Sequence, residues 1–313
     1  MEKLCFGLLS TSSIAPRFLA ALRATGVGEA VAVSSRSLEK AKEKAAAWDV
    51  PKAYGGHQAL LYDREVNIVY ISNVNSEHYP WAKRALECGK HVICEKPCTT
   101  TAEHTRELYA LAREKGLFLM EAQKMLFLPA LQAVKDRLPE LGQIHMAELS
   151  HSFLGSYNGW MYDLSVGGGP LLSSGIYAIH LLLWLFGEIK EIRGKRSTLE
   201  NGAEWQYILT GSTKSGVLFS AKNSTRAVLD NTARLFGEHG YVEIPNYWKA
   251  RKAIFHITGK EPETVEFPCE FELSYELEHI AQCFEKKWLT SPVVTEELSV
   301  AGIRTLEQVK RSW

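Results

Sequence analysis

The sequence predicts an α/β protein in two parts: a doubly wound parallel sheet, then an α+β part with a mostly antiparallel sheet. In the first 122 residues, short apolar runs rich in β-branched residues alternate with helical stretches, which is typical of parallel strands joined by helices. After about residue 125, strand-like runs follow one another directly. Consecutive strands of this kind indicate an antiparallel sheet with helices on one face.

Length and composition agree with two globular domains. The chain has 313 residues, of which 46% are hydrophobic and 10% aromatic, enough for a sizeable core in each of about two domains. Lys plus Arg number 36 and Asp plus Glu number 36, so the formal net charge is zero. This balance gives no electrostatic reason to expect a nucleic acid or an anionic membrane as a partner.

Five strands and four helices are predicted in the first part. The strands comprise residues 4–10, 29–35, 66–72, 91–95 and 118–122. The helices comprise residues 14–25, 38–48, 77–88 and 102–115. The strand at 66–72 is apolar almost throughout, as expected of a parallel strand covered on both faces.

The second part has helices at its start, middle and end. They are predicted at residues 128–138, 171–186, 275–287 and 296–311. Strands are predicted at residues 144–153, 190–196, 205–210, 216–224, 233–236 and 253–257. The change of pattern near residues 122–125 gives predicted domains of residues 1–123 and 124–313.

The cysteines and the apolar runs indicate the compartment. None of the six cysteines forms a C-x-x-C pair, so we expect free thiols in a reducing cytoplasm and no metal site. The apolar run at residues 4–9 is too short for a signal-peptide core. The apolar run at 176–186 falls below the ~20 residues of a spanning helix. We therefore expect a cytoplasmic protein without a membrane partner.

The first strand–helix turn is a candidate phosphate-binding loop, because ligands of doubly wound sheets bind at the carboxyl ends of the strands. The turn reads S-x-S-x-x-A from Ser10 to Ala15, where dinucleotide-binding turns read G-x-G-x-x-G/A. Ser13 is predicted to cap the following helix, and loop hydroxyls and N–H groups to donate to phosphate. A polar turn with a good N-cap explains the same residues about equally well. The predicted cofactor contacts here are Ser10, Thr11, Ser12, Ser13 and Ile14.

The end of the second strand bears on the choice of cofactor. It reads Ser35-Arg36, and Lys40 follows one helical turn later. An acidic side chain at this place binds the ribose 2′-hydroxyl of NAD, whereas an arginine fork and a hydroxyl bind a 2′-phosphate. A solvated arginine at a helix start is the alternative. We favour NADP, with NAD possible, and predict Ser35, Arg36 and Lys40 as contacts.

The strand at 91–95 leads directly into Glu95-Lys96-Pro97. A lysine at the carboxyl end of a strand, followed by a rigid proline, is expected to point into the ligand crevice. The tripeptide by itself is common, and its place in this architecture is what makes it informative.

The helix at 171–186 is apolar almost all round, so we expect it to be buried. Ser173, Tyr177, His180 and Trp184 follow one another at offsets of four, three and four residues, which places them on one helix face. Polar groups along one face of a core helix suggest a pocket wall. A core Tyr and His with satisfied hydrogen bonds are the alternative, but three polar groups just after a run of three glycines favour a site.

Taken together, these motifs resemble the Gfo/Idh/MocA family of NAD(P)-dependent oxidoreductases, on its dihydrodiol dehydrogenase and glucose–fructose oxidoreductase side, over nearly the whole chain. The motifs, in order, are Ile14-Ala15, Ser35-Arg36, Asn75 to His78, residues 85–92, Glu95-Lys96-Pro97, Met120 to Ala122 and residues 167–177. The resemblance implies a Rossmann domain and a mixed α/β domain whose open sheet forms a homodimer interface. It also implies cofactor contacts from Asn73, Asn75, His78, Glu95 and Lys96.

The resemblance implies Lys96 and Tyr177 as catalytic residues. Oxidation of an alcohol must remove the hydroxyl proton, and a tyrosine with its ordinary pKa of ~10 is a poor base unless a nearby ammonium lowers that pKa. Lys96 could supply this charge. The hypothesis is that Tyr177 acts as general acid/base, while Lys96 orients the substrate oxygen and tunes Tyr177.

Three departures from the family pattern involve four positions. Ser173 stands where an Asp is frequent, Ser10 and Ser12 stand where Gly is usual, and Leu126 stands where many relatives carry Arg. Lys124, at the end of the sixth strand, could replace some of that positive charge, although a surface lysine is an equal alternative. Together with Ser173 and His180, it is predicted to bind substrate.

The favoured function is an NADP-dependent oxidoreductase that transfers a hydride between the nicotinamide and a sugar, polyol or dihydrodiol-like alcohol or carbonyl. The alternative is a catalytically silent NADP-binding sensor or regulatory protein. Ser173 in place of Asp supports the alternative. Retention of Lys96 and Tyr177 speaks against it.

Overall fold

The computed structural model describes residues 3–155 and 159–313. The chain divides into two units. The first unit comprises Met1–Gln123 and Phe271–Ser299, and the second comprises Lys124–Glu270 and Val300–Trp313. The sequence placed all of residues 124–313 in one domain. The structure instead assigns residues 271–299 to the first unit, because helix α8 (Ser274–Glu285) packs against α1 (Ala15–Thr25).

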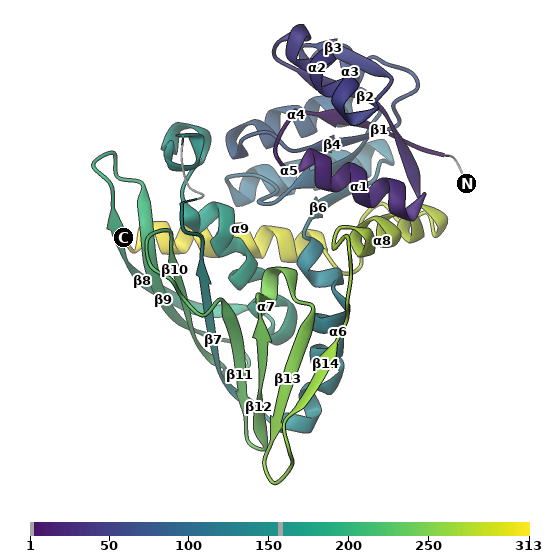
Figure 1. Cartoon of the computed structure of the whole chain (residues 1–313). Helices are drawn as coiled ribbons and strands as arrows, with labels where there is room; N and C mark the ends of the chain where they lie inside the picture. Colours follow the sequence, from purple (N-terminus) through teal and green to yellow (C-terminus); the bar gives the residue numbers. More distant parts are fainter. Residues whose placement is uncertain (1–2, 156–158) are drawn as a thin grey trace. The chain divides into compact units, whose positions relative to one another are not determined.

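The first unit contains a six-stranded parallel sheet with the strand order β3-β2-β1-β4-β5-β6 (Figure 1). The strands are β1 (Leu4–Leu9), β2 (Gly28–Ser35), β3 (Lys52–Gly55), β4 (Ile68–Ile71), β5 (His91–Glu95) and β6 (Leu119–Ala122). The remaining helices of this unit are α2 (Leu38–Trp48), α3 (His57–Leu61), α4 (Asn75–Glu87) and α5 (Ala102–Lys115). This is the doubly wound order, and the predicted fold class is confirmed.

The helices of this unit start and stop at clear local signals. The Ser37 and Thr101 hydroxyls accept backbone N–H groups at the starts of α2 and α5, as N-caps do. Gly26 and Gly116 end α1 and α5 in the left-handed conformation, which glycine adopts without a Cβ penalty.

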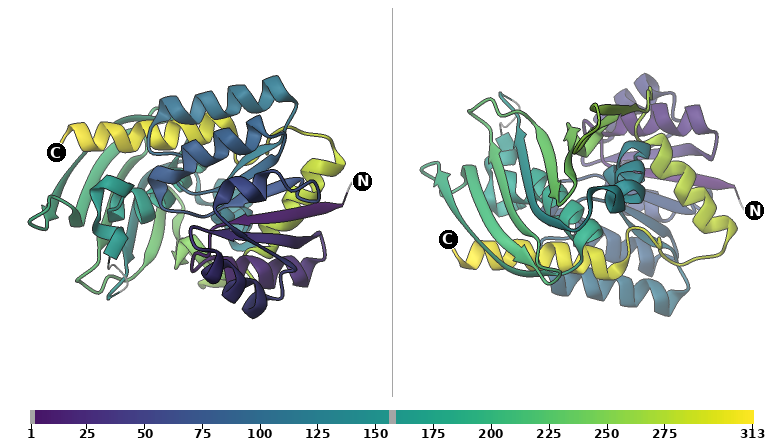
Figure 2. Two further views of the ribbon diagram at one scale, coloured as in Figure 1. Left: turned by 90° about the horizontal axis from the view of Figure 1, so that it is seen from above. Right: turned by 90° about the horizontal axis from the view of Figure 1, so that it is seen from below.

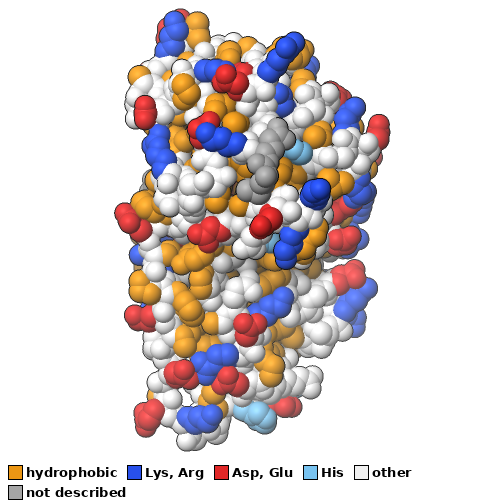
Figure 3. Space-filling model, turned by 90° about the vertical axis from the view of Figure 1, so that its right-hand side faces the viewer, with side chains coloured by type: hydrophobic (Ala, Val, Ile, Leu, Met, Phe, Trp, Pro, Cys, Tyr) orange, Lys and Arg blue, Asp and Glu red, His pale blue; other side chains and the backbone are white. Residues whose placement is uncertain are grey.

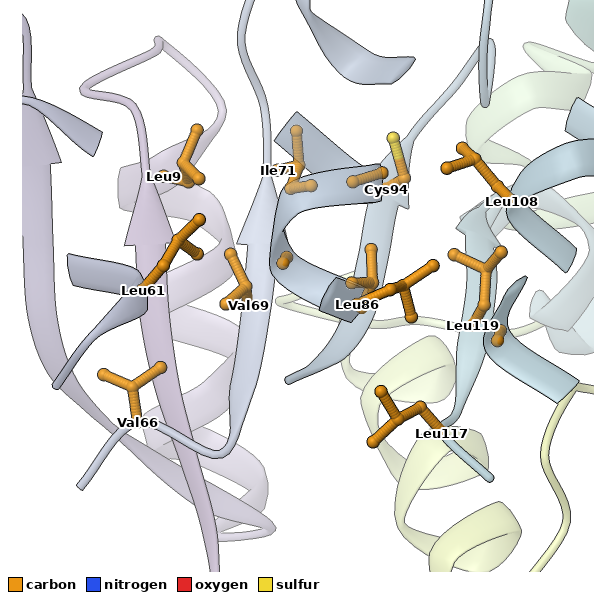
Figure 4. Close-up of a cluster of buried hydrophobic side chains, with 14 of the residues drawn as sticks. Leu9, Leu61, Val66, Val69, Ile71, Leu86, Cys94, Leu108, Leu117 and Leu119 are labelled. Atoms are coloured by element: carbon orange, nitrogen blue, oxygen red, sulfur yellow. The ribbon is translucent and has the colours of Figure 1, made fainter. Parts of the chain in front are cut away.

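A buried hydrophobic cluster joins the sheet to α4 and α5 (Figure 4). Ile71, Val69 and Leu119 project from the strands toward Leu86 of α4 and Leu108 of α5, and all five are fully buried. Burying one such side chain contributes about 1.5–3 kcal/mol. In Figure 4, α1 and α8 lie behind the sheet, so that helices cover both faces.

The second unit contains an eight-stranded sheet with the order β14-β13-β12-β11-β7-β10-β9-β8. Its strands are β7 (Ile144–Ser152), β8 (Ile189–Thr198), β9 (Glu204–Thr213), β10 (Leu218–Ser224), β11 (Thr232–Gly237), β12 (Gly240–Pro245), β13 (Lys252–Ile257) and β14 (Glu263–Glu266). Only β7 and β10 pair in parallel among the described strands of this sheet. The mostly antiparallel character is therefore confirmed.

Helices cover one face of this second sheet (Figures 1 and 2). They are α6 (Pro129–Arg137), α7 (Ile176–Phe186) and the part of α9 (Glu296–Arg311) that belongs to the unit. Arg137 of α6 lies 4.0 Å above the ring of Phe255 on β13, and Lys135 of α6 lies 4.2 Å above the ring of Trp184 on α7. These contacts connect α6 both to the sheet and to α7.

Three strands and one α-helix were not predicted from the sequence. They are β3, α3, β12 and β14. β3 and β14 are four-residue edge strands without a buried residue, so neither carries an apolar run. The helix predicted at 171–186 is present, but its first five residues, Leu171–Gly175, form a π-helical turn, and the α-helix α7 begins only at Ile176.

Among the described residues, one helical stretch of 23 residues, Leu164–Phe186, is long and apolar enough to span a membrane by length and composition. This exceeds the 11 apolar residues of α7 on which the sequence-based expectation was based. Within the most apolar 18-residue window of the stretch, 78% is buried inside the structure, as expected of a core helix.

The surface charges are mixed. Figure 3 shows Lys and Arg side chains interspersed with Asp and Glu on the face it draws.

A small polar cluster lies between α8 and the segment that follows it. His279 Nε2 lies 2.7 Å from Ser291 Oγ and 3.3 Å from Cys283 Sγ. Ser291 Oγ accepts the backbone N–H groups of Val293 and Val294, so its own proton is available for His279. Burial lowers the pKa of His279 to about 4.

This cluster predicts a pH-dependent stability. An unfolded histidine titrates near ~6.5, so between pH 6.5 and about 4 the unfolded state binds more protons than the folded state. The stabilisation is complete above that window and is lost as the pH falls through it, by about 1–2 kcal/mol after allowance for partial exposure. Urea unfolding at pH 7 to 4 should show a shallower loss for His279→Gln than for the wild type. The exposed His239→Gln is the control, and identical slopes for all three proteins would contradict the prediction.

Candidate active site

The predicted residues of the first unit lie along one edge of its sheet. Parallel strands end at the same edge, so the segments that follow β1, β2, β4 and β5 lie close together there. Residues 10–14 follow β1, residues 35–40 include the end of β2, residues 73–78 follow β4, and residues 95–96 include the end of β5. The strand order reverses between β1 and β4, the place where doubly wound sheets bind ligands.

The loop after β1 departs from the prediction at its helix start. Ile14 is the N-cap of α1, and no side chain caps this helix, so the predicted Ser13 cap is wrong. Pro16 lies in the first turn of the helix, a position that favours a helix start. Ser12 Oγ donates to Ser72 Oγ, just after β4, at 2.8 Å. Ser10 has a φ of 135°, a conformation that normally requires glycine.

A buried hydrogen-bonded chain links the ends of β2 and β4 through His57, which the sequence-based prediction missed. Asn73 Nδ2 lies 3.3 Å from His57 Nε2, and His57 Nδ1 lies 2.8 Å from Ser34 Oγ. An amide nitrogen can only donate, so Nε2 accepts and Nδ1 carries the proton. Burial lowers the pKa of His57, and Arg36 adds to this effect. His57 is the first residue of a five-residue helix, and no sequence motif points to it.

Asn73 keeps one unused acceptor. Its Oδ1 is buried and has no hydrogen-bond partner within residues 3–155 and 159–313. Arg36 is exposed, and its guanidinium makes no hydrogen bond or ion pair with the described part of the chain. Lys40 is exposed nearby on α2. An unused acceptor and free positive charge fit a ligand that carries both hydroxyl and phosphate groups.

 Both ring nitrogens of His78 contact backbone oxygens, Nδ1 that of Pro97 at 2.8 Å and Nε2 that of Asn73 at 3.0 Å. The ring is 1% exposed, and burial lowers its pKa. Glu95 accepts Tyr70 OH at 2.6 Å and the backbone N–H of Lys96 at 3.2 Å. These side chains join the loop after β4 to the cis Lys96–Pro97 segment.

In the second unit, Tyr177 is the second residue of α7 and belongs to an aromatic cluster. The ring of His151, near the end of β7, lies 6.5 Å from the Tyr177 ring at an angle of 76°. His151 also packs on Trp248 at 3.8 Å and on Phe153 at 4.6 Å. The sequence-based prediction missed His151 and Trp248, because strand β7 and a short helical turn bring them to Tyr177 only in the folded unit.

The predicted polar stripe on the helix is changed by the π-helical turn. A π-helical turn has more residues than an α-helical turn, so Ser173 does not keep the α-helical offset from Tyr177. Ser173 Oγ donates to the oxygen of Gly169 at 2.8 Å. His180 is fully buried against α9, where a Cβ atom at Gly302 would lie 2.3 Å from its Nε2. This place in the core supports packing for His180 more than contact with a substrate.

Lys124 begins the second unit and opens a short 3-10 helix. Its side chain is buried, with 7% exposed. This burial argues against the surface lysine that the sequence left open. Within the described residues, no group of three or more His, Cys, Asp or Glu side chains could hold a metal ion, and none of the six cysteines described there forms a disulfide bond.

The doubly wound six-stranded sheet, with its polar and basic carboxyl edge, has the architecture of a dinucleotide-binding domain. The chain belongs to the Gfo/Idh/MocA family. Residues 6–123 match its model described as "Oxidoreductase family, NAD-binding Rossmann fold", and residues 132–243 match the model of its C-terminal domain. The protein is therefore an NAD(P)-dependent oxidoreductase of the dehydrogenase type, as the sequence predicted.

Known relatives extend the similarity over the whole chain. The trans-1,2-dihydrobenzene-1,2-diol dehydrogenase of Mus musculus is 31% identical over 98% of this chain and 96% of its own length. The Homo sapiens enzyme of the same name is 32% identical over the same shares.

Solved structures show the same fold. A 3-ketoreductase from Actinomadura kijaniata, in complex with NADP and TDP-benzene, has a TM-score of 0.91 at 24% identity, covering 99% of this chain and 98% of its own. A levoglucosan dehydrogenase, in complex with NADH and levoglucosan, has a TM-score of 0.89 at 17% identity, covering 99% and 97%.

The positive φ of Ser10 predicts how a substitution there changes the free energy of unfolding. Replacing Ser10 by Gly should relieve a strain of about 1–3 kcal/mol, against a loss of about 0.4–1 kcal/mol from the freer unfolded chain. Ser13→Gly is the matched control, because Ser13 lies in the same loop without a positive φ. Urea unfolding should show Ser10→Gly to be more stable than Ser13→Gly by about 1–2 kcal/mol. Equal stabilities would contradict the strain at Ser10.

Proposed function

We propose that this protein is an NADP-dependent dehydrogenase that transfers a hydride between the nicotinamide and a sugar, polyol or dihydrodiol-like alcohol or carbonyl. The observation that carries the cofactor choice is Arg36, an exposed guanidinium directly after β2 without an internal partner among the described residues. A planar fork of donors at this place binds a 2′-phosphate. The diol dehydrogenases at about 31% identity support the substrate class.

The cofactor would be held by the carboxyl edge of the first sheet. In this proposal, Ser10, Thr11, Ser12, Ser13 and Ile14 face the pyrophosphate. Ser35, Arg36 and Lys40 bind the 2′-phosphate, and the acceptor Asn73 Oδ1 takes a donor from the ligand. Asn75, His78 and Glu95 support these contacts by shaping the loops after β4 and β5, and Lys96 lies at the nicotinamide end.

Proton transfer is assigned to side chains of the chain itself. The bound nicotinamide supplies the two-electron acceptor or donor. Tyr177 takes the hydroxyl proton of an alcohol or returns it to a carbonyl oxygen, and Lys96 orients that oxygen and lowers the pKa of Tyr177. Lys124 and Ser173 complete the substrate contacts in the proposal, with His180 behind them.

We further propose that the protein forms a homodimer through the second sheet and that it is located in the cytoplasm. The face of this sheet that its own helices leave uncovered carries exposed Met146 and Leu218, which are direct neighbours across β7 and β10. Exposed apolar groups gathered on one sheet face are typical of a subunit interface. The lack of a disulfide bond among the six described cysteines supports a reducing compartment.

The role of Arg36 predicts a change in cofactor preference. Arg36→Ala should weaken NADP binding by about 10- to 100-fold, because a charge-assisted pair with phosphate contributes about 1.5–3 kcal/mol. NAD binding should change little, since it has no 2′-phosphate. Fluorescence titration of both cofactors measures the ratio, with the exposed Arg106→Ala as control. An unchanged ratio of the two dissociation constants would exclude this role.

Turnover tests the catalytic assignment. Lys96→Ala and Tyr177→Phe should each lower kcat by about 100-fold or more, in line with the loss of general acid–base catalysis. The measurement is NADPH absorbance with a panel of aldoses, polyols and dihydrodiols. Full activity of either variant would refute its assignment. Tight NADP binding by the wild type with no turnover on any substrate would favour a sensor instead.

A further inference from the structure

A buried carboxylate holds the start of the helical turn that precedes Tyr177. Glu204 is the first residue of β9 and is 3% exposed. Its Oε1 accepts the backbone N–H of Leu171 at 3.0 Å. Leu171 begins the π-helical turn, and an N–H group at a helix start has no acceptor within the helix. Glu204 supplies the partner that this N–H group needs.

The backbone before the turn fits around the same carboxylate. Gly169 has a φ of 108°, which side chains rarely permit. A Cβ atom at Gly169 would lie 2.4 Å from Glu204 Oε1 and 3.0 Å from Oε2. The oxygen of Gly169 accepts both the backbone N–H of Ser173 at 3.1 Å and its Oγ–H at 2.8 Å. Glu204, Gly169 and Ser173 therefore form one connected set of contacts.

The negative charge of Glu204 strengthens its contact with the start of the turn at Leu171. Burial raises the pKa of Glu204, while the hydrogen bond from Leu171 and the charges of Lys310 and Arg196 oppose that rise. Burial lowers the pKa of Lys310, and Glu204 opposes that fall in turn. A negative charge beside a helix start is stabilising, so the ionised form of Glu204 favours the turn.

We propose that Glu204 is a positioning residue for the substrate half of the active site, where it holds the π-helical turn that sets Ser173 and Tyr177. The inference rests on the proposed role of Tyr177. The turn ends at Gly175 and α7 begins at Ile176, so a shift of the turn moves the phenol of Tyr177. A displacement of about 1 Å at a reacting group lowers the rate by about 100-fold.

Two variants separate positioning from simple loss of stability. Glu204→Ala removes the acceptor, while Glu204→Gln keeps an oxygen of similar reach without the charge. We expect kcat of the Ala variant to fall by about 10- to 100-fold and that of the Gln variant by less than about threefold. NADP binding should stay within about twofold for both, because the proposed cofactor contacts belong to the first unit, whereas Glu204 and its partner Leu171 belong to the second. Glu200→Ala, which removes an exposed carboxylate from the β8–β9 turn, is the matched control.

Hydrogen exchange tests the same inference without turnover. Amides of residues 171–177 should exchange at least about tenfold faster in Glu204→Ala than in the wild type. They should stay within about fivefold of the wild-type rate in Glu204→Gln, which loses only the charge, and at the wild-type rate in Glu200→Ala. If the wild type turns over no substrate, the proposed function fails and exchange alone decides the role of Glu204. Unchanged exchange in the Ala variant, or equal losses of kcat in the Ala and Gln variants, would overturn the positioning role.

Discussion

The close approach of α3 to β1 is the constraint on which the cofactor edge of the first unit depends. A Cβ atom at Gly7 would lie 2.7 Å from a methyl carbon of Leu60, so glycine at this point lets α3 pack directly on the strand. That packing carries His57, at the start of α3, to Ser34 and Asn73. The ends of the second and fourth strands are thereby joined by a buried side chain.

Polar side chains connect the strand ends around the loop that follows β1. Ser12 binds Ser72, His57 binds Asn73, and His78 binds backbone oxygens of two loops. The Ser12–Ser72, His57–Asn73 and His78–Pro97 contacts cross from one strand end to another, whereas the contact of His78 with Asn73 lies within the segment after β4. The loop after β1 can therefore keep its shape with serines at positions where glycine is usual, although Ser10 adopts a strained backbone.

In the second unit, a π-helical turn and side chains from distant elements position the candidate residues. The π-helical turn inserts an irregular step between Gly169 and Tyr177, and Glu204 occupies the space beside it. His151 and Trp248 reach Tyr177 from other elements. The environment of the phenol is thus built by residues far apart in the chain, which no local pattern of the helix reveals.

The sequence by itself determined the fold class, the strands and helices with continuous apolar or helical patterns, and the candidates Arg36, Lys96 and Tyr177. These follow from local periodicity and from positions next to strand ends, which depend on neighbouring residues only. Only the tertiary structure decided that α8 joins the first unit, that Ser13 caps nothing and that His180 is packed against α9. It also decided that His57 contacts Ser34 and Asn73, and that Glu204 accepts the N–H of Leu171. The reason is physical: short edge strands, single buried polar residues and a π-helical turn are stabilised by distant partners, and their sequences carry no periodic signal.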